Sequence, residues 1–250
     1  MQTIAITNRK GGVGKSTTAL NLAAALTRKG YKVLLIDTDS QCNLTSTIKG
    51  ENKPHSVFNI LQGIDAKKAI KSTPQGDFIA GSQELATADL VFTSTGKEFK
   101  LKEALDPISG QYDYCIIDTP PALGVLTVQA LTAASYILIP TQPDLYGLQG
   151  IEQLRQILDP IKKYCNRDLL TAGVLITRYR KSIVKNEVIE KLQEVAEQEL
   201  NSRLFKTYIR ECNALFEAQV MQADIFQHAP KSNAAADYEA FTNELLQAIK

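Results

Sequence analysis

Short apolar runs alternate with amphipathic segments along the chain, and this alternation predicts strands separated by helices. The start is clearest: an apolar, β-branched run at 3–7, a glycine-rich turn, an amphipathic stretch ending at Gly30, and a second apolar run at 32–37. A short apolar run bounded by turn residues is typical of a buried strand, and apolar positions three or four residues apart are typical of a helix. Residues 3–37 are therefore predicted to form a β-α-β unit with parallel strands and a right-handed crossover.

The same alternation continues to the C-terminus. Strands are predicted at residues 77–81, 112–118, 136–140, 169–177 and 204–209, and helices at residues 97–105, 123–133, 147–164, 184–200 and 235–249. Residues 49–76 are polar and are predicted to form short helices at one edge. Together these elements predict an α/β fold with a single doubly wound, mostly parallel twisted sheet and helices on both faces.

Composition narrows the class of protein. A chain of 250 residues with 44% hydrophobic and 22% charged residues suits one globular core, so residues 1–250 are predicted to form a single domain. The formal net charge of +1 means that any attraction to nucleic acid must come from a local patch. Four scattered cysteines without a C-x-x-C pair fit a reducing cytosol better than a disulfide framework or a zinc site. The sequence has no signal-peptide pattern and no apolar run long enough to span a membrane, so we expect a cytoplasmic protein.

The turn after the first strand carries phosphate-binding chemistry. Its sequence at 8–18 is NRKGGVGKSTT, and the turn that can cradle phosphates with backbone N–H groups consists of Gly11, Gly12, Val13 and Gly14. Lys15 can reach the terminal phosphates, the Ser16 hydroxyl can bind Mg²⁺, and Thr17 can reach the α-phosphate. A strand before the loop and a helix after it are the context that a P-loop requires, so the sequence predicts a P-loop nucleotide site.

A second lysine departs from the usual P-loop. The strict pattern G-x-x-x-x-G-K-[ST] has glycine where Arg9 stands, and Lys10 follows it. Because Lys10 precedes the glycines, its side chain is expected to point away from its own phosphate groove. The residues alone leave two interpretations open, a solvated loop lysine or a cation with a function.

Three aspartates follow apolar strands. Asp37 ends the run at 32–37, Asp39 lies just beyond it, and Asp118 ends the run at 112–118. The carboxyl ends of parallel strands form the ligand edge of an open sheet, and an aspartate there holds Mg²⁺ in P-loop enzymes, often through water. Asp118 is therefore interpreted as the Walker B residue. A turn or helix-cap role in its Asp-Thr-Pro-Pro context is the alternative.

The stretch KGGVGKST resembles the deviant Walker A motif of the ParA/MinD ATPases, and the likeness is greatest to short, Soj-like ParA partition proteins. This resemblance implies an ATP- and Mg²⁺-dependent ATPase that forms a homodimer when ATP is bound. It implies that Lys15 contacts the phosphates of its own subunit, whereas Lys10 crosses the interface to those of the partner. Two polyphosphates buried face to face repel each other, and lysines from both subunits would offset that charge.

The resemblance also assigns the carboxylates. LLIDTDSQCN, at 34–43, is similar to the family motif D-x-D-P-Q-x-N, with Ser40 where proline is usual. By this match Asp39 positions or activates the attacking water, and Asp37 supports the metal site together with Ser16 and Asp118. A carboxylate of ordinary pKa is a weak base, so we expect orientation of the water and slow turnover.

Weaker matches concern the dimer seam and the base. The segment 139–150 resembles a family segment that usually has glutamate where Asp144 stands, and it is expected to line the seam. Thr177 and Arg178, which end a predicted strand, are expected to wall the nucleotide base together with the turn after Ile209.

Basic residues cluster between 161 and 186 and again at 203–210, and they form either a phosphate-binding patch or a solvated surface. The resemblance favours binding of nonspecific double-stranded DNA by the ATP-bound dimer. The candidate DNA-binding residues are Arg180, Lys181, Lys185 and Arg210. Glu211 and Ala214 stand where many relatives have arginine, so weaker or relocated DNA binding is expected.

The favoured function is that of a partition ATPase, nucleoid-associated in the cytoplasm, which acts with a ParB-like adaptor to segregate or position plasmid, mobile-element or chromosomal DNA. No N-terminal DNA-reading domain is expected, and the C-terminal segment at 238–250 is too acidic to favour membrane binding. The alternative is a cytosolic positioning or regulatory switch that acts on a protein without DNA. A metabolic enzyme such as an iron–sulfur reductase or a carboxylase-type ligase is disfavoured, because the reductase needs a seam cysteine that neither Cys42 nor Cys115 suits.

Overall fold

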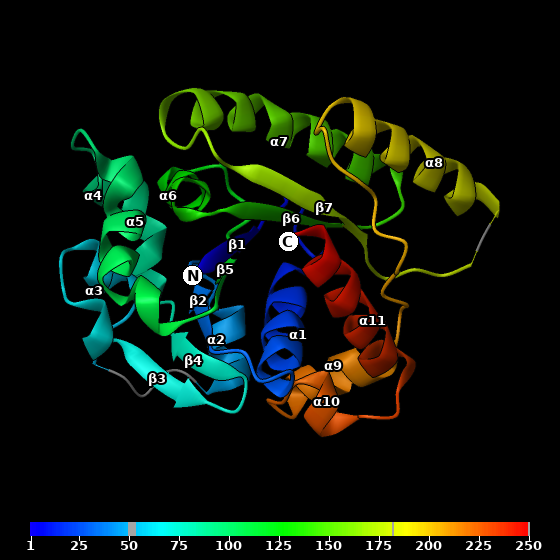
Figure 1. The fold of residues 1–250 in the computed structure, drawn as a ribbon, viewed down its shortest axis with the longest axis horizontal. Coiled ribbons are helices and arrows are strands. Elements are labelled where there is room, and N and C mark those ends of the chain that lie inside the picture. Colours follow the sequence, from blue (N-terminus) through cyan, green and yellow to red (C-terminus); the bar gives the residue numbers. More distant parts are fainter. Residues whose placement is uncertain (50–53, 182, 250) are drawn as a thin grey trace.

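A seven-stranded sheet forms the centre of the computed structural model, which describes residues 1–49, 54–181 and 183–249 (Figure 1). The strand order is β3-β4-β2-β5-β1-β6-β7, and all neighbours are parallel except β3 and β4. The strands are β1 (Gln2–Ile6), β2 (Val33–Asp37), β3 (Ile70–Thr73), β4 (Gly76–Ile79), β5 (Tyr114–Asp118), β6 (Tyr136–Thr141) and β7 (Leu170–Ile176). The predicted α/β fold with a mostly parallel sheet is confirmed.

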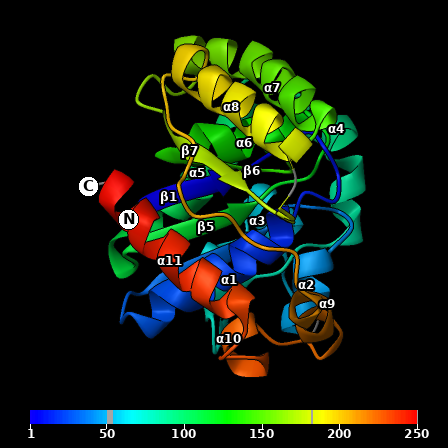
Figure 2. The ribbon, with the colours of Figure 1, turned by 90° about the vertical axis from the view of Figure 1, so that its right-hand side faces the viewer.

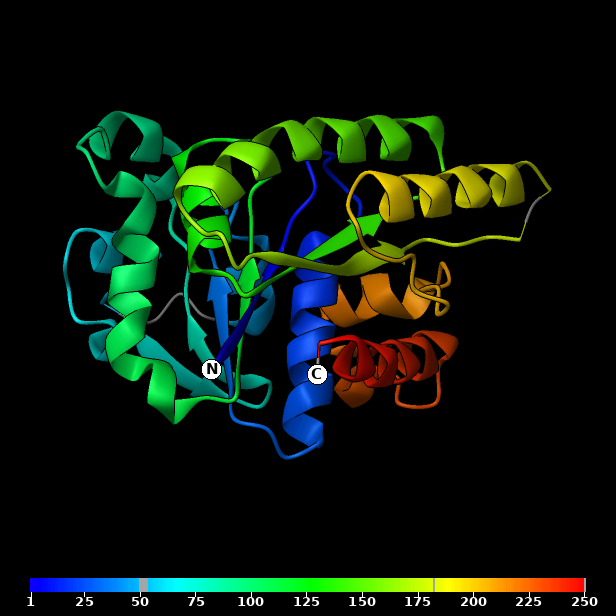
Figure 3. The same cartoon turned by 45° about the horizontal axis from the view of Figure 1, so that its top comes forward.

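Helices cover both faces of the sheet. One face carries α3 (Val57–Leu61), α4 (Ala88–Val91), α5 (Lys100–Leu105), α6 (Val125–Ala133), α7 (Leu145–Tyr164) and α8 (Ile183–Gln198). The other carries α1 (Lys15–Arg28), α2 (Asn43–Ile48), α9 (Asn213–Val220), α10 (Ile225–His228) and α11 (Asn233–Ala248). Figure 3 shows α7 and α8 on one side of the strands and α1 and α11 on the other.

The alternation of side chains along the strands supplies a core to each layer. In β1, Ile4 and Ile6 pack toward α1 and α11, whereas Ala5 faces the opposite layer. In β5, Ile116 and Ile117 divide in the same way, and all these side chains are fully buried. Strands buried on both faces read as continuous apolar runs, and this is why they stood out in the sequence.

Most predicted elements agree with the structure, but three segments do not. Residues 204–209, all of which the structure describes, form no strand, although they run beside β7. An isolated bridge pairs Leu204 with Val174, and the N–H groups of Phe205 and Ile209 donate to carbonyls of β7. The N–H groups of Lys206 and Thr207 donate to the Glu244 carboxylate of α11 and not to a strand neighbour.

The second difference lies in residues 49–76, where short helices were predicted. Helix α3 and a 3₁₀ turn at Ala66–Lys68 confirm part of this prediction, and residues 50–53 lie outside the described chain. Strand β3, however, pairs antiparallel with β4 as a hairpin, and its polar sequence IKST gave no strand signal because it lies at the sheet edge. The third difference is that the short helices α2, α4, α9 and α10 were not predicted.

Among the described residues, no helix combines the length and the apolar character needed to cross a membrane.

Gly173 of β7 offers a test of this packing, because a Cβ at that position would lie 2.5 Å from Cε2 of the Phe205 ring. Phe205 is fully buried and packs edge to face on Phe241 of α11, so it has little room to move. We expect Gly173→Ala to lower the free energy of unfolding by about 1–3 kcal/mol in urea denaturation. Gly110→Ala is the control, because a Cβ there would meet no described atom within 4 Å. Equal stability of the two variants would contradict this account of the β7–α11 layer.

Candidate nucleotide-binding site

The P-loop joins the end of β1 to the start of α1 at the carboxyl edge of the sheet. Gly12 and Gly14 have φ of 74° and 84°, a left-handed conformation that favours glycine. Gly14 is the N-cap of α1, and no side chain of the described residues caps this helix end. The first N–H groups of α1 are thus available to an anion, and the helix dipole favours negative charge there.

Hydrogen bonds at the ends of β6 and β7 hold the P-loop in place. The Val13 side chain is fully buried, and its carbonyl accepts a hydrogen bond of 2.8 Å from the Thr177 hydroxyl. The same hydroxyl also donates to the Thr141 carbonyl, which ties the loop to β6 and β7. The geometry of the turn is therefore set before any nucleotide binds.

Lys15 is a largely desolvated cation beside carboxylates. Its side chain is buried, and burial lowers its pKa, whereas the nearby Asp118 and Asp39 carboxylates raise it. A cation held in this way costs free energy unless counter-charge is close, and a phosphate would add to that counter-charge.

Asp118 is a carboxylate with unmet hydrogen-bonding capacity. It is fully buried at the end of β5, and neither oxygen has a hydrogen-bond partner among the described residues. Burial raises its pKa well above the usual range, and the neighbouring Asp37 adds to the shift, whereas Ser16 and Lys15 oppose it. A buried carboxylate beside a serine hydroxyl fits Mg²⁺, which takes oxygen ligands. The described residues hold no cluster of three or more metal-ligating side chains, so further ligands would have to come from water and phosphate.

Asp37 is next to Asp118 in the β2–β5 register, but its oxygens are engaged by the chain. It accepts hydrogen bonds from the Asp39 N–H at 3.0 Å, and from the N–H and hydroxyl of Thr45 at 2.9 and 2.7 Å. Burial raises its pKa to about 6, although these hydrogen bonds act in the opposite direction. Asp37 thus anchors the segment that carries Asp39. Thr45 in α2 is a supporting residue that the sequence reasoning missed, since nothing in NLTSTI marks it out.

Asp39 lies at the same edge, largely buried, and one carboxylate oxygen accepts a hydrogen bond of 3.0 Å from the Gln41 N–H. The three aspartates, Lys15 and the start of α1 are therefore brought together as the sequence predicted. The arrangement can hold a polyphosphate, because Lys15 and the first N–H groups of α1 lie next to the carboxylates.

Lys10 is held by its own subunit on the side of the loop that faces β6 and α7. Its Nζ lies 2.5 Å from Oδ2 of Asp144 and 3.4 Å from Oε1 of Gln142. Asp144 also caps α7 by accepting a hydrogen bond from the Gly147 N–H, and Gln142 donates to the Gly12 carbonyl. Asp144 thus meets Lys10 directly, an arrangement that sequence matching alone did not indicate.

A cavity of about 240 Å³ adjoins the P-loop at Gly14 and Thr17. Two of its walls, Thr177 and Arg178, are those expected for the base, and Arg178 has a left-handed φ of 49°. The turn after Ile209, which was also expected near the base, lines the cavity as well. A further wall comes from the start of α9 and was not predicted, because this helix gave no clear periodic signal; its lining residues include Asn213, Leu215, Phe216 and Gln219.

The candidate DNA-binding cations are not all available. Arg180 forms an ion pair with Glu211, and Arg210 makes a two-pronged ion pair with Asp237, with one contact at 2.6 Å. The Asp237 pair raises the pKa of Arg210. Lys181 is exposed, and the side chain of Lys185 lies outside the described part of the chain.

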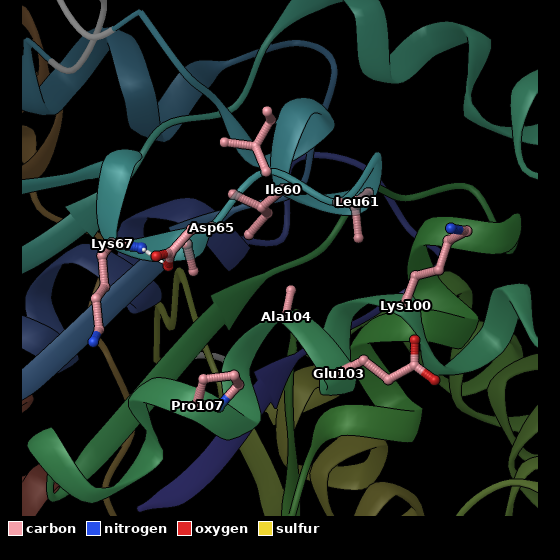
Figure 4. A pocket seen from close by; sticks show the side chains of 11 residues that line it. Ile60, Leu61, Asp65, Lys67, Lys100, Glu103, Ala104 and Pro107 are labelled. Atoms are coloured by element: carbon pink, nitrogen blue, oxygen red, sulfur yellow. Dashed lines mark hydrogen bonds between the residues drawn. The ribbon is translucent and has the colours of Figure 1, made fainter.

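A second cavity, of about 430 Å³, opens between α3 and α5 at the far edge of the sheet (Figure 4). Ile60, Leu61, Ala104 and Pro107 form its apolar centre, with charged side chains at the rim. It contains no P-loop residue, so it is separate from the nucleotide site.

Comparisons with known proteins agree with this geometry. The profile of a family described as "AAA domain" matches residues 1–171. The chain is 38% identical to the sporulation initiation inhibitor protein Soj of Bacillus subtilis, over 97% of both chains. It is 34% identical to the chromosome-partitioning ATPase Soj of Thermus thermophilus, over 99% of this chain and 96% of that one. The solved structure of cobyrinic acid a,c-diamide synthase from Mycobacterium smegmatis, with a bound ATP analogue and magnesium, has a TM-score of 0.85 at 31% identity, over 99% and 95% of the two chains.

Because the Asp118 carboxylate has no partner among the described residues, its removal is expected to raise the stability of the protein in a pH-dependent way. Because the pKa of Asp118 is raised in the folded state, its contribution to stability is lost as pH rises above about 4, the usual range for an unfolded aspartate. Without nucleotide and with a chelator present, Asp118→Asn should therefore melt at a higher temperature than wild type at pH 8. This difference in melting temperature should shrink toward pH 5. For a chain of this length, each 1 kcal/mol of stability corresponds to about 2–4 °C in the melting temperature.

The measurement is the melting temperature of both proteins across this pH range. A difference between the two proteins that does not change with pH would contradict the buried, ionisable state of Asp118. The same variant should lose Mg²⁺-dependent ATP hydrolysis, which would separate its stability from its function.

Proposed function

The chain belongs to the ParA/MinD family of P-loop ATPases, and from this membership we propose that it is a ParA-like partition ATPase whose ATP-bound dimer binds nonspecific DNA. The chain is an ATPase, and relatives of its fold bind ATP analogues and magnesium. We propose that residues 1–250 act as one domain and work with a ParB-like DNA-binding adaptor at the nucleoid.

One observation carries the proposal: the P-loop presents two lysines that are held in different directions. Lys15 is buried against the carboxylates of its own site, whereas Lys10 is held toward Asp144 on the outer side of the loop. One phosphate tail needs one such lysine. A second cation at the same sheet edge suits a second tail, brought by another subunit.

The roles of the side chains follow from their positions. The N–H groups of the P-loop and the Lys15 ammonium bind and orient the β- and γ-phosphates. Ser16 and Asp118 would hold Mg²⁺, which neutralises charge on the phosphates when bound. Asp39 orients the attacking water, and Asp37 fixes the segment on which Asp39 lies.

For the base, we propose the cavity between Arg178 and α9. It begins at Thr17, which follows the phosphate-binding residues, and its lining mixes apolar side chains such as Leu215 and Phe216 with polar and charged ones. We propose that the purine and its ribose occupy this cavity, because ligands bind in concave sites in preference to open surface.

For DNA, we propose a contribution from Lys181, Lys185, Arg180 and Arg210, and the exposed Lys181 is more readily engaged than the two paired arginines. The pairing of Arg180 with Glu211 and of Arg210 with Asp237 favours the alternative function, a cytosolic switch that recruits a protein and no DNA. The two functions differ in one measurable property, which is salt-sensitive DNA binding that requires ATP.

The two P-loop lysines can be separated by substitution. Lys15→Ala should weaken Mg·ATP binding by about 10–100-fold, because it removes a charge-assisted contact to the phosphates. Lys10→Ala should leave binding by the monomer within about twofold but abolish ATP-dependent dimerisation. Calorimetry measures the first effect, and analytical ultracentrifugation with a slowly hydrolysed ATP analogue measures the second. A Lys10→Ala protein that dimerises normally would remove this account of the second lysine.

Asp39→Ala tests the partition function itself. Loss of water orientation should slow hydrolysis by about 100-fold and trap an ATP-bound dimer, which should accumulate on nonspecific duplex DNA. The measurement is DNA binding with ATP and with ADP across a salt series, and binding with ATP should fall steeply as salt rises. Absence of DNA binding at low salt by a dimer that forms normally would favour the protein switch. Unchanged hydrolysis in this variant would contradict the role of Asp39.

A further inference from the structure

A buried asparagine on the P-loop helix joins the phosphate side of the nucleotide site to the helices on its base side. Asn21 lies in α1, one turn beyond Thr17, and is 2% exposed. The residues around it in this helix are leucine and alanine, and asparagine is a weak helix former. A buried polar side chain in such a helix therefore needs an explanation.

Both ends of the Asn21 amide are engaged. Its Nδ2 donates to the Thr17 carbonyl at 2.8 Å, and its Oδ1 accepts from the Ile225 N–H at 2.8 Å. Thr17 lines the base cavity, and Ile225 is the first residue of α10. One side chain thus connects the nucleotide site to a helix about 200 residues later in the chain.

The contacted helix is held from a second direction by a buried aspartate. Asp224 caps α10 by accepting hydrogen bonds from the Phe226 and Gln227 N–H groups at 2.9 and 3.0 Å. Its other oxygen accepts from the Gln75 amide at 2.8 Å, in the turn between β3 and β4. The start of α10 is therefore fixed between α1 and the β3–β4 hairpin.

Helix α9 is joined to this fixed point by a short turn. The Ala223 N–H donates to the Ala218 carbonyl, and the Gln222 side chain donates to the Ser46 carbonyl of α2. Figure 2 shows α9 beside α2, next to α10 and the lower end of α11. Leu215 and Phe216 of α9 line the base cavity, so the placement of α10 sets where this wall lies.

We propose that Asn21 is a positioning residue for the base side of the nucleotide site, acting through α10 and α9 without touching the phosphates. This inference rests on the base cavity proposed above. It predicts that the side chain contributes to binding of the nucleoside and not to binding of the polyphosphate, because its two hydrogen bonds are to the Thr17 carbonyl and the Ile225 N–H and leave the N–H groups of the phosphate-binding turn untouched.

The test compares two ligands on one protein. With Mg²⁺ present, Asn21→Ala should raise the Kd for ATP by about five- to tenfold, the effect of losing a buried hydrogen bond and leaving its partner unpaired. The Kd for inorganic tripolyphosphate should change by less than about twofold. In steady-state hydrolysis the KM for ATP should rise by the same factor as its Kd, with kcat within about twofold.

Two further variants make the comparison interpretable. Asn166→Ala is the matched control, because its amide donates to the Leu131, Thr132 and Ala134 carbonyls, far from the cavity. It should lower the melting temperature without changing the ratio of the two Kd values. Gln75→Ala removes the second contact to Asp224 and should give a smaller ATP-selective loss, so it carries the test if Asn21→Ala does not fold.

The outcomes separate this inference from the proposed function. Equal weakening of ATP and tripolyphosphate, or unchanged ATP binding by Asn21→Ala and Gln75→Ala, would overturn the positioning role while leaving the ATPase intact. Wild-type protein that binds tripolyphosphate as tightly as ATP would instead remove the proposed base cavity. An ATP-selective loss in both variants, absent in Asn166→Ala, would support the inference.

Discussion

The structure depends on a group of buried charges that the chain alone does not fully satisfy. Asp118 has no hydrogen-bond partner among the described residues, Lys15 is desolvated, and burial raises the pKa of both Asp118 and Asp37. Burying such groups costs free energy, and the two apolar cores on either side of the sheet must offset that cost. A phosphate tail with Mg²⁺ would supply the missing counter-charges. Ligand binding and stability are therefore coupled at this sheet edge.

At this sheet edge, side chains of the same type have different surroundings and different roles. Asp37 accepts three hydrogen bonds and holds the chain, whereas the fully buried Asp118 has no hydrogen-bond partner among the described residues. Lys15 is packed into its own site, whereas Lys10 lies against Asp144 at the start of α7. In the proposed dimer, movement of Lys10 toward another subunit would break that ion pair and would link dimer formation to the conformation of the β6–α7 loop.

The fold and the catalytic edge could be predicted because their signals are local. Buried parallel strands are continuous apolar runs, and the predicted β1–β7 strands other than β3 end within two residues of the observed ones. The P-loop and the aspartates follow such strands directly. The wrong predictions involve contacts between residues distant in the sequence. Residues 204–209 are apolar enough to predict a strand, but two N–H groups of this segment donate to Glu244 of α11. Asn21 matters through Ile225, about 200 residues later, and Thr45 matters through a loop contact to Asp37 that no local pattern marks.

Charge counting along the sequence is the weakest guide to partners for the same reason. In the sequence, Arg180 and Arg210 belong to a basic cluster. In the structure, Arg180 pairs with Glu211 and Arg210 pairs with Asp237, which is itself buried. A DNA phosphate must compete with that carboxylate before it gains either guanidinium, so the local field is weaker than the sum of cations suggests. Glu211 pairs with Arg180 and offsets its charge. If DNA is the partner, the contact must therefore draw on cations that a dimer brings together from two subunits.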